Sequence, residues 1–381
     1  SLSTALLLAG ALPGVLGHTW IEQLRNIDAQ GNYVGEFGYP RGMYSKTDPG
    51  YDGDKMNHQV PSVKEKSFPF ISADSPLCHP AQRKPEQSSD KYPRLKTAPG
   101  QFIAMRYMEN GHITKPETRL GKPDQSGPVY IYGTTQPKED EKLANVLQWT
   151  ADGQGGDKRG VLLTVNNYDD GRCYEINDKP ISKERQAKFP NYAAGQVSDG
   201  PGNYPLFCES NVAIPKDAAV GKPYTLYWVW QWNTVPGVDP GLPKGQDEYY
   251  TTCMDVDVVD VIQQGAKAQL GLVQQDAMSV APDGFRSRTA VITDAMSFEM
   301  GPVFNTTRTA TGSVPSVTMT QTTLVTSSGA PFQNSTASLQ IPTLTKRPGD
   351  VPTATPTDGD DVVRITVTQR VTVTAPAVTA T

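Results

Sequence analysis

The chain has 381 residues, with 35 basic and 40 acidic side chains and a formal net charge of -5. This mild negative charge argues against nucleic acid and against an anionic membrane surface as partners, because both require a strongly basic face. The 34 glycines and 32 prolines make up about one residue in six, which indicates a loop-rich chain that can still bury a core.

The first residues predict secretion. Residues 5–16 form an apolar run interrupted by Pro13, with small residues Val15 and Gly17 before an expected cleavage point. Such a run is too short to span a bilayer and is typical of the core of a signal peptide. The alternative is a buried N-terminal segment. No other stretch is long and apolar enough for a membrane helix, so we expect a secreted protein, extracellular or attached to the cell wall.

The region that follows reads as all-β. Strands are predicted over residues 101–108, 128–133, 160–165, 224–232 and 250–262. In 224–232 the even positions are Tyr, Leu and three Trp, so this face is predicted to lie against the core. In the last strand Asp255 and Asp257 alternate with apolar residues and are predicted to face solvent. Short strands and Gly/Pro-rich connections, without convincing helical periodicity, favour a β-sandwich with long loops.

The C-terminal third has a different composition. Residues 305–346 contain 12 Thr and 6 Ser. A segment of this composition has too few apolar side chains for their burial to offset the loss of chain entropy on folding. Asn305 and Asn334 are N-glycosylation acceptors by sequence. We therefore expect three parts: a signal peptide at 1–17, a β-sandwich domain at 18–262, and a disordered Thr/Ser-rich linker or stalk at 263–381.

Cleavage after Gly17 would make His18 the N-terminal residue. Its free α-amine and its imidazole Nδ1 could then chelate one metal ion, and a third nitrogen from another histidine would complete a plane that suits Cu(II). A histidine at a predicted cleavage site can also arise by chance, so the other ligands must be sought elsewhere in the chain.

Two further residues complete a candidate copper site. His112 follows the strand at 101–108 after Gly111, which frees the backbone to turn and predicts a histidine at the rim of the sandwich. The alternative is a solvated loop histidine. Tyr250 lies three residues before Cys253 at the start of a strand, where its phenol could point along the copper axis.

Several motifs carry a family resemblance. They are HTW at 18–20, PGQFIAMRYMENGH ending at 112, GPVYIYGT, and YTLYWVWQW followed by EYYTTCMDV. With them, most of 18–262 resembles the lytic polysaccharide monooxygenase superfamily of secreted histidine-brace copper proteins. The last pair is similar to the chitin-active fungal branch. The opening HTWIEQL and GEFGYPRG are more similar to fungal monooxygenase-like proteins of unassigned function.

The resemblance implies an immunoglobulin-like β-sandwich that binds one copper ion. His18 and His112 match the brace, and Tyr250 matches the axial position. Glu248 matches a position near the oxygen site, where many members of the superfamily have Gln. The implied activity is oxidative cleavage of a β-linked polysaccharide, chitin or another cell-wall glycan, by a monomer that takes electrons from an external donor.

The four cysteines of a secreted chain predict two disulfides, for which three connectivities exist. Related folds tie the last strand to an early loop, so the resemblance implies Cys78–Cys253. Cys173 and Cys208 bracket one insertion, and their disulfide would close a loop of about 35 residues.

Two other functions fit the same residues. The protein could be a non-catalytic copper carrier of the cell surface that uses the same brace, which the stalk favours. It could also be a structural wall glycoprotein with a vestigial brace. Among other candidates, His58 is expected to be solvated and His79 to be a loop residue beside a disulfide. The tyrosines of the long loop, Tyr39, Tyr44 and Tyr51, could bind glycan or pack within the loop.

Overall fold

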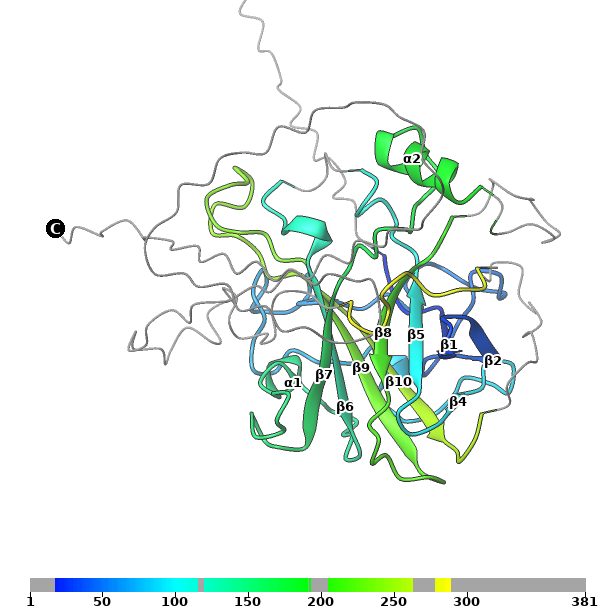
Figure 1. Ribbon diagram of the computed structural model, residues 1–381. Coiled ribbons are helices and arrows are strands. Elements are labelled where there is room, and N and C mark those ends of the chain that lie inside the picture. The colour runs from blue at the N-terminus through cyan, green and yellow to red at the C-terminus, as the bar shows by residue number, and fades with distance from the viewer. Residues whose placement is uncertain (1–17, 116–119, 191, 193–204, 263–277, 289–381) are drawn as a thin grey trace, which may run out of the picture. The chain divides into compact units, whose positions relative to one another are not determined.

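The computed structural model describes residues 18–115, 120–190, 192, 205–262 and 278–288 (Figure 1). The predicted signal peptide at 1–17, both glycosylation acceptors Asn305 and Asn334, and the Thr/Ser-rich tail from 289 onward lie outside these residues.

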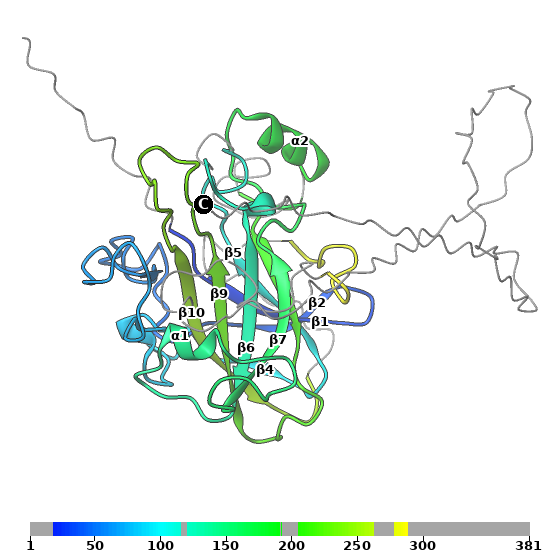
Figure 2. The same cartoon turned by 90° about the vertical axis from the view of Figure 1, so that its left-hand side faces the viewer.

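Two β-sheets form the domain. The smaller has the order β2-β1-β5-β8, with β1 at Gln23–Ile27, β2 at Tyr33–Gly38, β5 at Phe102–Tyr107 and β8 at Cys208–Ala213. The larger has the order β3-β10-β9-β6-β7, with β3 at Gln59–Val60, β6 at Pro128–Thr134, β7 at Gly160–Asn167, β9 at Pro223–Gln231 and β10 at Tyr249–Val258. All these pairs are antiparallel, while β4 (Leu95–Thr97) joins β10 in parallel. The sheets pack face to face (Figure 2), which confirms the predicted β-sandwich.

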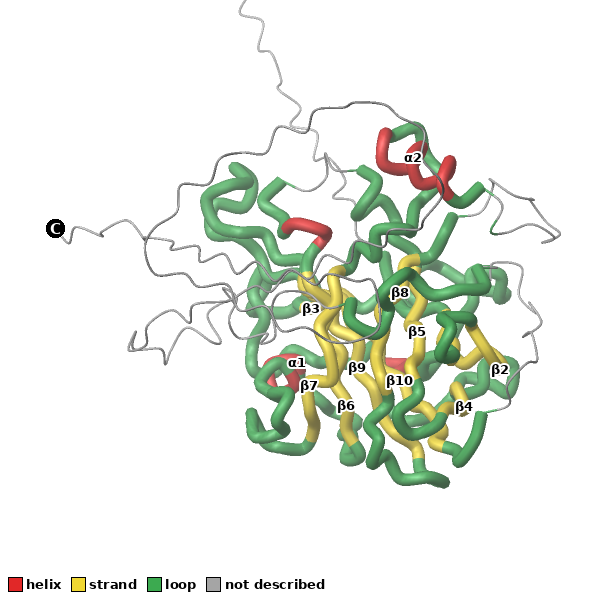
Figure 3. The backbone as a smooth tube through the Cα atoms, in the orientation of Figure 1, coloured by secondary structure: helices red, strands yellow, loops and turns green. Residues whose placement is uncertain are grey.

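Helices are short and peripheral. They are α1 at Leu143–Val146, α2 at Pro180–Lys188 and the 3-10 turns η1 at Pro80–Gln82 and η3 at Asp124–Ser126. In Figure 3, α2 lies with loops beyond one end of the strands. No helix in the described part of the chain has the length and apolar character needed to cross a membrane.

The main core lies between the sheets. It combines Leu24, Ile103 and Met105 of the smaller sheet with Trp228 and Met254 of the larger one, and all five are fully buried. Burying apolar side chains of this size contributes about 1.5–3 kcal/mol each. The expected orientation of β9 is therefore correct, since its even positions face this core.

The opposite face of β9 is buried as well. Tyr227 and Val229 pack with Leu77, Leu147 and Trp149 in a second apolar cluster on the outer side of the larger sheet. The long loops and α1 thus act as a third layer that covers this sheet.

All five predicted strands are present, and each observed strand lies within two residues of its predicted limits except β10, which ends at Val258, four residues before the predicted limit. The strands β1 to β4 and β8 were not predicted. In β1 the sequence QLRNI mixes apolar with polar residues, yet all five are buried, so its pattern does not alternate. β8 is CESNVA, whose polar residues are buried under segments distant in sequence.

The prediction that Asp255 faces solvent is wrong. Its side chain is 1% exposed and accepts two hydrogen bonds from the buried Arg41, from Nε at 2.7 Å and from Nη2 at 2.6 Å. Thr225 on the neighbouring strand donates a third, at 2.7 Å. The loop that carries Arg41 covers this face of the strand, and alternation alone could not reveal that cover. Asp257, in contrast, has a side chain that is 44% exposed.

Asp255→Asn should destabilise the domain by about 3 kcal/mol, because it leaves the buried Arg41 guanidinium without its counter-charge. Asp257→Asn, on the same strand, should change the free energy of unfolding by less than about 0.5 kcal/mol. Urea unfolding of both variants measures the difference. Equal midpoints would contradict a buried ion pair at Asp255.

The two disulfides are Cys78–Cys253 and Cys173–Cys208, with sequence separations of 175 and 35 residues. These are the two expected pairs. The first fastens the loop before η1 to β10, and the second joins the segment after β7 to the start of β8.

Residues 278–288 belong to the segment expected to be a linker, but they pack on the smaller sheet. Met278 and Ala281 are buried with Ile27 and Tyr174, and Phe285 makes an edge contact with the ring of Phe102 at 5.5 Å between centroids. Backbone hydrogen bonds join Tyr33 to Ser279 and Ala281 to Gly31, at 2.9 and 2.8 Å. We therefore propose that the stalk starts after residue 288.

A chain truncated after Arg288 should keep the full stability of the domain. A chain truncated after Ile262 should lose at least about 2 kcal/mol, because it exposes the surface that Met278 and its neighbours cover. Denaturant unfolding of the two chains tests this boundary. Indistinguishable unfolding transitions would place the end of the domain at residue 262.

Candidate metal centre

Strand register gathers the candidate residues at one end of the sandwich. Gln23 at the start of β1 pairs with Arg106 near the end of β5, and Tyr249 at the start of β10 pairs with Gln231 at the end of β9. The two sheets are joined there, since the backbone N–H of Ile21 donates to Thr252 Oγ1 at 3.2 Å. The segments that carry His18, His112, Glu248 and Tyr250 therefore meet at this end.

His18 is tied directly to the loop that carries His112. The side-chain amide of Asn110 donates to the backbone carbonyl of His18, and Thr19 Oγ1 donates to the carbonyl of Met108 at 3.0 Å. The Tyr168 hydroxyl donates to Thr19 Oγ1 at 3.2 Å. The imidazole of His18 is 35% exposed, and its Nε2 lies 3.8 Å from Asp54 Oδ1. These contacts hold the start of the described chain beside the 108–112 turn.

His112 lies beyond the end of β5 and is buried, with an exposed fraction of 2%. Its ring meets Trp230 and Trp232 edge-on, at 4.9 and 4.3 Å between centroids, and lies 6.2 and 6.3 Å from the rings of Tyr168 and Tyr250. The alternative of a solvated loop histidine is therefore wrong, because these aromatic rings enclose the turn.

The turn itself has the conformation that the sequence predicts. Gly111 has a φ of 83° and Asn110 a φ of 47°, both in the left-handed region. Glu109, 2% exposed, then holds the following segment, because its Oε2 accepts from the backbone N–H of Ile113 at 2.6 Å and its Oε1 from that of Glu175 at 2.9 Å. Burial raises the pKa of Glu109 above its usual value. Nothing in the sequence distinguished Glu109 as a positioning residue.

Burial keeps the His112 imidazole neutral. It lowers the pKa of His112 to about 3, with smaller contributions from the positive charges of Lys122, His18 and Lys115. A neutral imidazole is the form that binds a metal ion.

One ring nitrogen of His112 also lacks a hydrogen-bond partner. Nε2 is buried, and no donor or acceptor within the described residues reaches it. A buried polar nitrogen without a partner costs about 1–3 kcal/mol, so its presence requires an explanation. A metal ion bound at this nitrogen would satisfy it, and imidazole nitrogen is a donor that suits copper among other transition metals.

Tyr250 and Glu248 lie together beside His112. The Tyr250 ring is fully buried and stacks on Trp230 at 5.0 Å between centroids. Its hydroxyl donates to Glu248 Oε1 at 2.6 Å. Glu248 Oε2 forms an ion pair with Lys122 Nζ at 2.5 Å. The sequence placed Tyr250 and Glu248 in the site but gave no signal for Lys122, which reaches it from a loop before η3.

Gln231 and the remaining histidines lie in other surroundings. Gln231, at the end of β9, accepts from Tyr130 at 3.2 Å and donates to Tyr249 at 3.1 Å, on the face of β9 opposite the candidate site. His58 is partly buried and not solvated as expected, and burial lowers its pKa to about 4. Its ring meets that of His79 edge-on at 5.8 Å.

The loop tyrosines pack within their own loop. Tyr39 is buried with Trp20 and Met56, and Tyr44 and Tyr51 pack against this cluster while remaining partly exposed. Of the two uses expected for these rings, packing is the one that the described contacts support.

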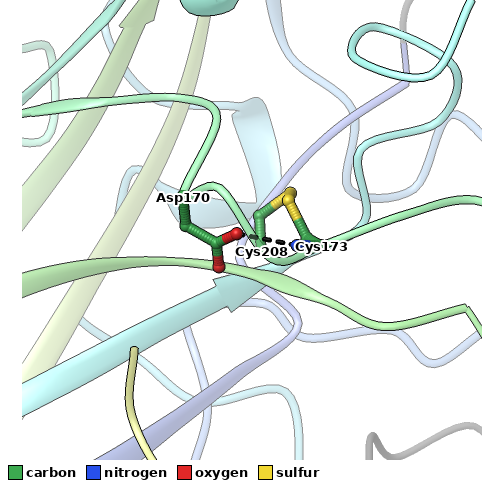
Figure 4. A group of neighbouring side chains, drawn as sticks. All are labelled: Asp170, Cys173 and Cys208. Atoms are coloured by element: carbon green, nitrogen blue, oxygen red, sulfur yellow. Dashed lines mark hydrogen bonds between the residues drawn. A yellow bond between two sulfur atoms is a disulfide. The ribbon is translucent and has the colours of Figure 1, made fainter. Parts of the chain in front are cut away.

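A second group of potential metal ligands is Asp170, Cys173 and Cys208 (Figure 4). The two sulfur atoms are bonded to each other, so neither can act as a thiolate ligand. Asp170 Oδ1 accepts from the backbone N–H groups of Arg172 and Cys173, both at 2.8 Å. Asp170 therefore stabilises the backbone turn next to the Cys173–Cys208 disulfide.

These features define a β-sandwich protein with a cluster of histidine, tyrosine and carboxylate side chains at one end of the sandwich. The sequence model of a family described as "Domain of unknown function (DUF7492)" matches residues 15–282. The chain therefore belongs to this family. No curated protein matches the sequence significantly.

Solved structures with a distantly similar fold include a protein named as a polysaccharide monooxygenase and one named as a glycoside hydrolase family 61 member. CvAA9A is 14% identical with a TM-score of 0.29, over 69% of this chain and 85% of its own. A cellulose-active polysaccharide monooxygenase from M. thermophila is 11% identical with a TM-score of 0.25, over 73% and 97%. The glycoside hydrolase family 61 member Cel61B from Hypocrea jecorina is 13% identical with a TM-score of 0.27, over 72% and 97%.

The burial of His112 predicts a pH dependence of the apo-protein's stability. The unfolded chain takes up a proton on this histidine below about pH 6.5, whereas the folded chain does so only near pH 3. Stability is therefore lost as pH falls below about 6.5, by up to about 1.4 kcal/mol per pH unit, and this loss ends near the folded pKa.

His112→Gln removes this titration. Between pH 6.5 and 4.5 the free energy of unfolding should fall less steeply in the variant than in the wild type. The two slopes should differ by up to about 1.4 kcal/mol per pH unit. Urea unfolding at several pH values measures both slopes. Parallel curves would show that His112 titrates normally in the folded protein.

Proposed function

We propose that the mature protein binds one copper ion through the His18 amine, the His18 imidazole and the His112 imidazole, with Tyr250 on the axial side. Two observations on neighbouring residues together support this proposal. The backbone of His18 is bonded to the turn that bears His112, and His112 presents a neutral, buried nitrogen without a partner.

When bound, copper would supply one-electron redox chemistry and activation of O₂ or H₂O₂. The chain's own residues provide the surroundings for it. Trp230, Trp232 and Tyr168 exclude water from the inner side of His112. The one-third exposed imidazole of His18 leaves the outer side open to a substrate. The site is thus enclosed on the side of His112 and accessible on the side of His18. An enzyme that oxidises a substrate on its surface requires such an arrangement.

The substrate class follows from the resemblance in sequence. We propose a secreted oxidoreductase that cleaves a β-linked polysaccharide, chitin or another cell-wall glycan, with an external electron donor. Two disulfides agree with an extracellular location, because such bonds persist in oxidising compartments.

A second function, copper binding without catalysis at the cell surface, is favoured by one observation. Of the loop tyrosines that could stack on sugar rings, Tyr39 is buried in the cluster around Trp20, and Tyr44 and Tyr51 are partly buried against it. A carrier would need the metal ligands but no flat aromatic surface for a polysaccharide.

Product analysis separates the two functions. Copper-loaded protein is incubated with a reductant, peroxide and a panel of glycans, and the soluble fraction is examined by mass spectrometry. Oxidised oligosaccharides that are absent with His112→Gln support the enzyme. Tight copper binding without oxidised products from any glycan supports the carrier.

The brace predicts that copper affinity depends on an unblocked N-terminus. One glycine added before His18 converts the amine into an amide, whose nitrogen lone pair is delocalised into the carbonyl group, and should weaken Cu(II) binding because the chelate ring loses its amine ligand. Isothermal titration of the mature and extended proteins measures both affinities.

Lys138→Gln is a suitable control, because Lys138 is an exposed surface residue and belongs to no part of the site. This variant should bind copper as the wild type does. Equal affinity of the mature and extended proteins would refute the brace, and with it both proposed functions.

A further inference from the structure

Lys122 is an unusual residue in the described structure, because most of its side chain is removed from solvent beside the candidate metal ligands. Its side chain is 9% exposed, and that of its partner Glu248 is 10% exposed. Nζ donates to Glu248 Oε2 at 2.5 Å and to the backbone carbonyl of Trp232 at 2.9 Å. It also lies 4.1 Å from the centroid of the Trp232 ring, in a cation–π contact.

These contacts fix the orientation of Glu248. With one carboxylate oxygen on Lys122 and the other on the Tyr250 hydroxyl, both oxygens are held, and the carboxylate has little freedom to turn. The hydroxyl proton of Tyr250 is directed to Glu248, so the lone pairs of the phenol oxygen point elsewhere. The chain Lys122–Glu248–Tyr250 thus runs from a buried cation to the residue proposed for the axial position.

The ion pair also sets the charge next to His112. The Trp232 ring, on which Lys122 lies, is itself 4.3 Å from the His112 ring. An unpaired carboxylate here would attract a metal cation, and an unpaired ammonium would repel it. In a site that excludes water such charges act strongly, because the effective dielectric constant is far below that of water.

We propose, on the basis of the copper site proposed above, that Lys122 is a positioning residue of this site. It neutralises Glu248 and holds it as the acceptor of the Tyr250 hydroxyl. It thereby limits the affinity for Cu(II) and keeps Glu248 from becoming a ligand itself. Lys122 does not bind the metal, and while Glu248 is present it acts through that carboxylate.

Opposite single substitutions test this proposal. Lys122→Met leaves Glu248 as an unpaired anion and should tighten Cu(II) binding by about tenfold. Glu248→Gln leaves Lys122 as an unpaired cation and should weaken it by about the same factor. The double variant has neither charge and should return to within about threefold of the wild type. A purely structural role of Lys122 would weaken binding in every variant.

Paramagnetic resonance of the copper-loaded proteins gives an independent readout. Lys122→Met should change the Cu(II) spectrum, because a released carboxylate can reach the metal, while Lys122→Arg should retain the wild-type spectrum. Lys91→Gln is the matched control. It removes a more exposed lysine–carboxylate pair, Lys91–Asp48 at 2.6 Å. Its affinity should change by less than about twofold, since the pair is more exposed.

The thermal transition of each apo-protein shows whether a variant is folded. If Lys122→Met does not fold, Lys122→Arg and Glu248→Gln decide the question. Wild-type affinity and spectrum in Glu248→Gln would overturn the proposal. So would a wild-type spectrum in Lys122→Met, or a change of the same sign in both single variants. If the wild type itself binds no copper, the proposed function fails as well, whereas these outcomes on a copper-binding wild type overturn only the role of Lys122.

Discussion

The enclosure of one neutral histidine by aromatic rings is the constraint on which the candidate site depends. His112 is buried among Trp230, Trp232, Tyr168 and Tyr250, and its Nε2 has no hydrogen-bond partner in the described structure. Such an arrangement costs free energy in the apo-protein, because both burial of the imidazole and its unmet hydrogen-bonding capacity are unfavourable. The proposed metal site gives this nitrogen lone pair a partner.

The sandwich provides the rigidity that such a site needs. The larger sheet is buried on both faces, between the core on one side and the loop layer on the other. Cys78–Cys253 and Arg41–Asp255 fasten this loop layer to β10, two residues apart on the same strand. Because Tyr250 is the second residue of β10, these two links also limit the movement of the candidate axial residue. Side chains held on rigid elements keep a ligand geometry better than side chains on mobile loops.

Much of this arrangement could be predicted from the sequence. The alternation of large aromatic residues in β9 predicted both the strand and its core face, and the even cysteine count predicted two disulfides. Expectations failed where burial comes from segments distant in sequence. The alternation in β10 predicts that Asp255 faces solvent, but Arg41 from a distant loop covers it. The strands β1 and β8 were not predicted, because their polar residues are buried by other parts of the chain. Lys122 could not be found at all, because a lone lysine in a loop carries no pattern, and only the fold brings it to Glu248.

The most direct test of the account is the location of copper in crystals of the mature protein, by anomalous diffraction at the copper absorption edge. The account predicts one peak per chain, bonded to the His18 amine, to the His18 imidazole and to His112, with the Tyr250 oxygen nearby. A peak at any other group of residues, or no peak in crystals grown with excess copper, would contradict it.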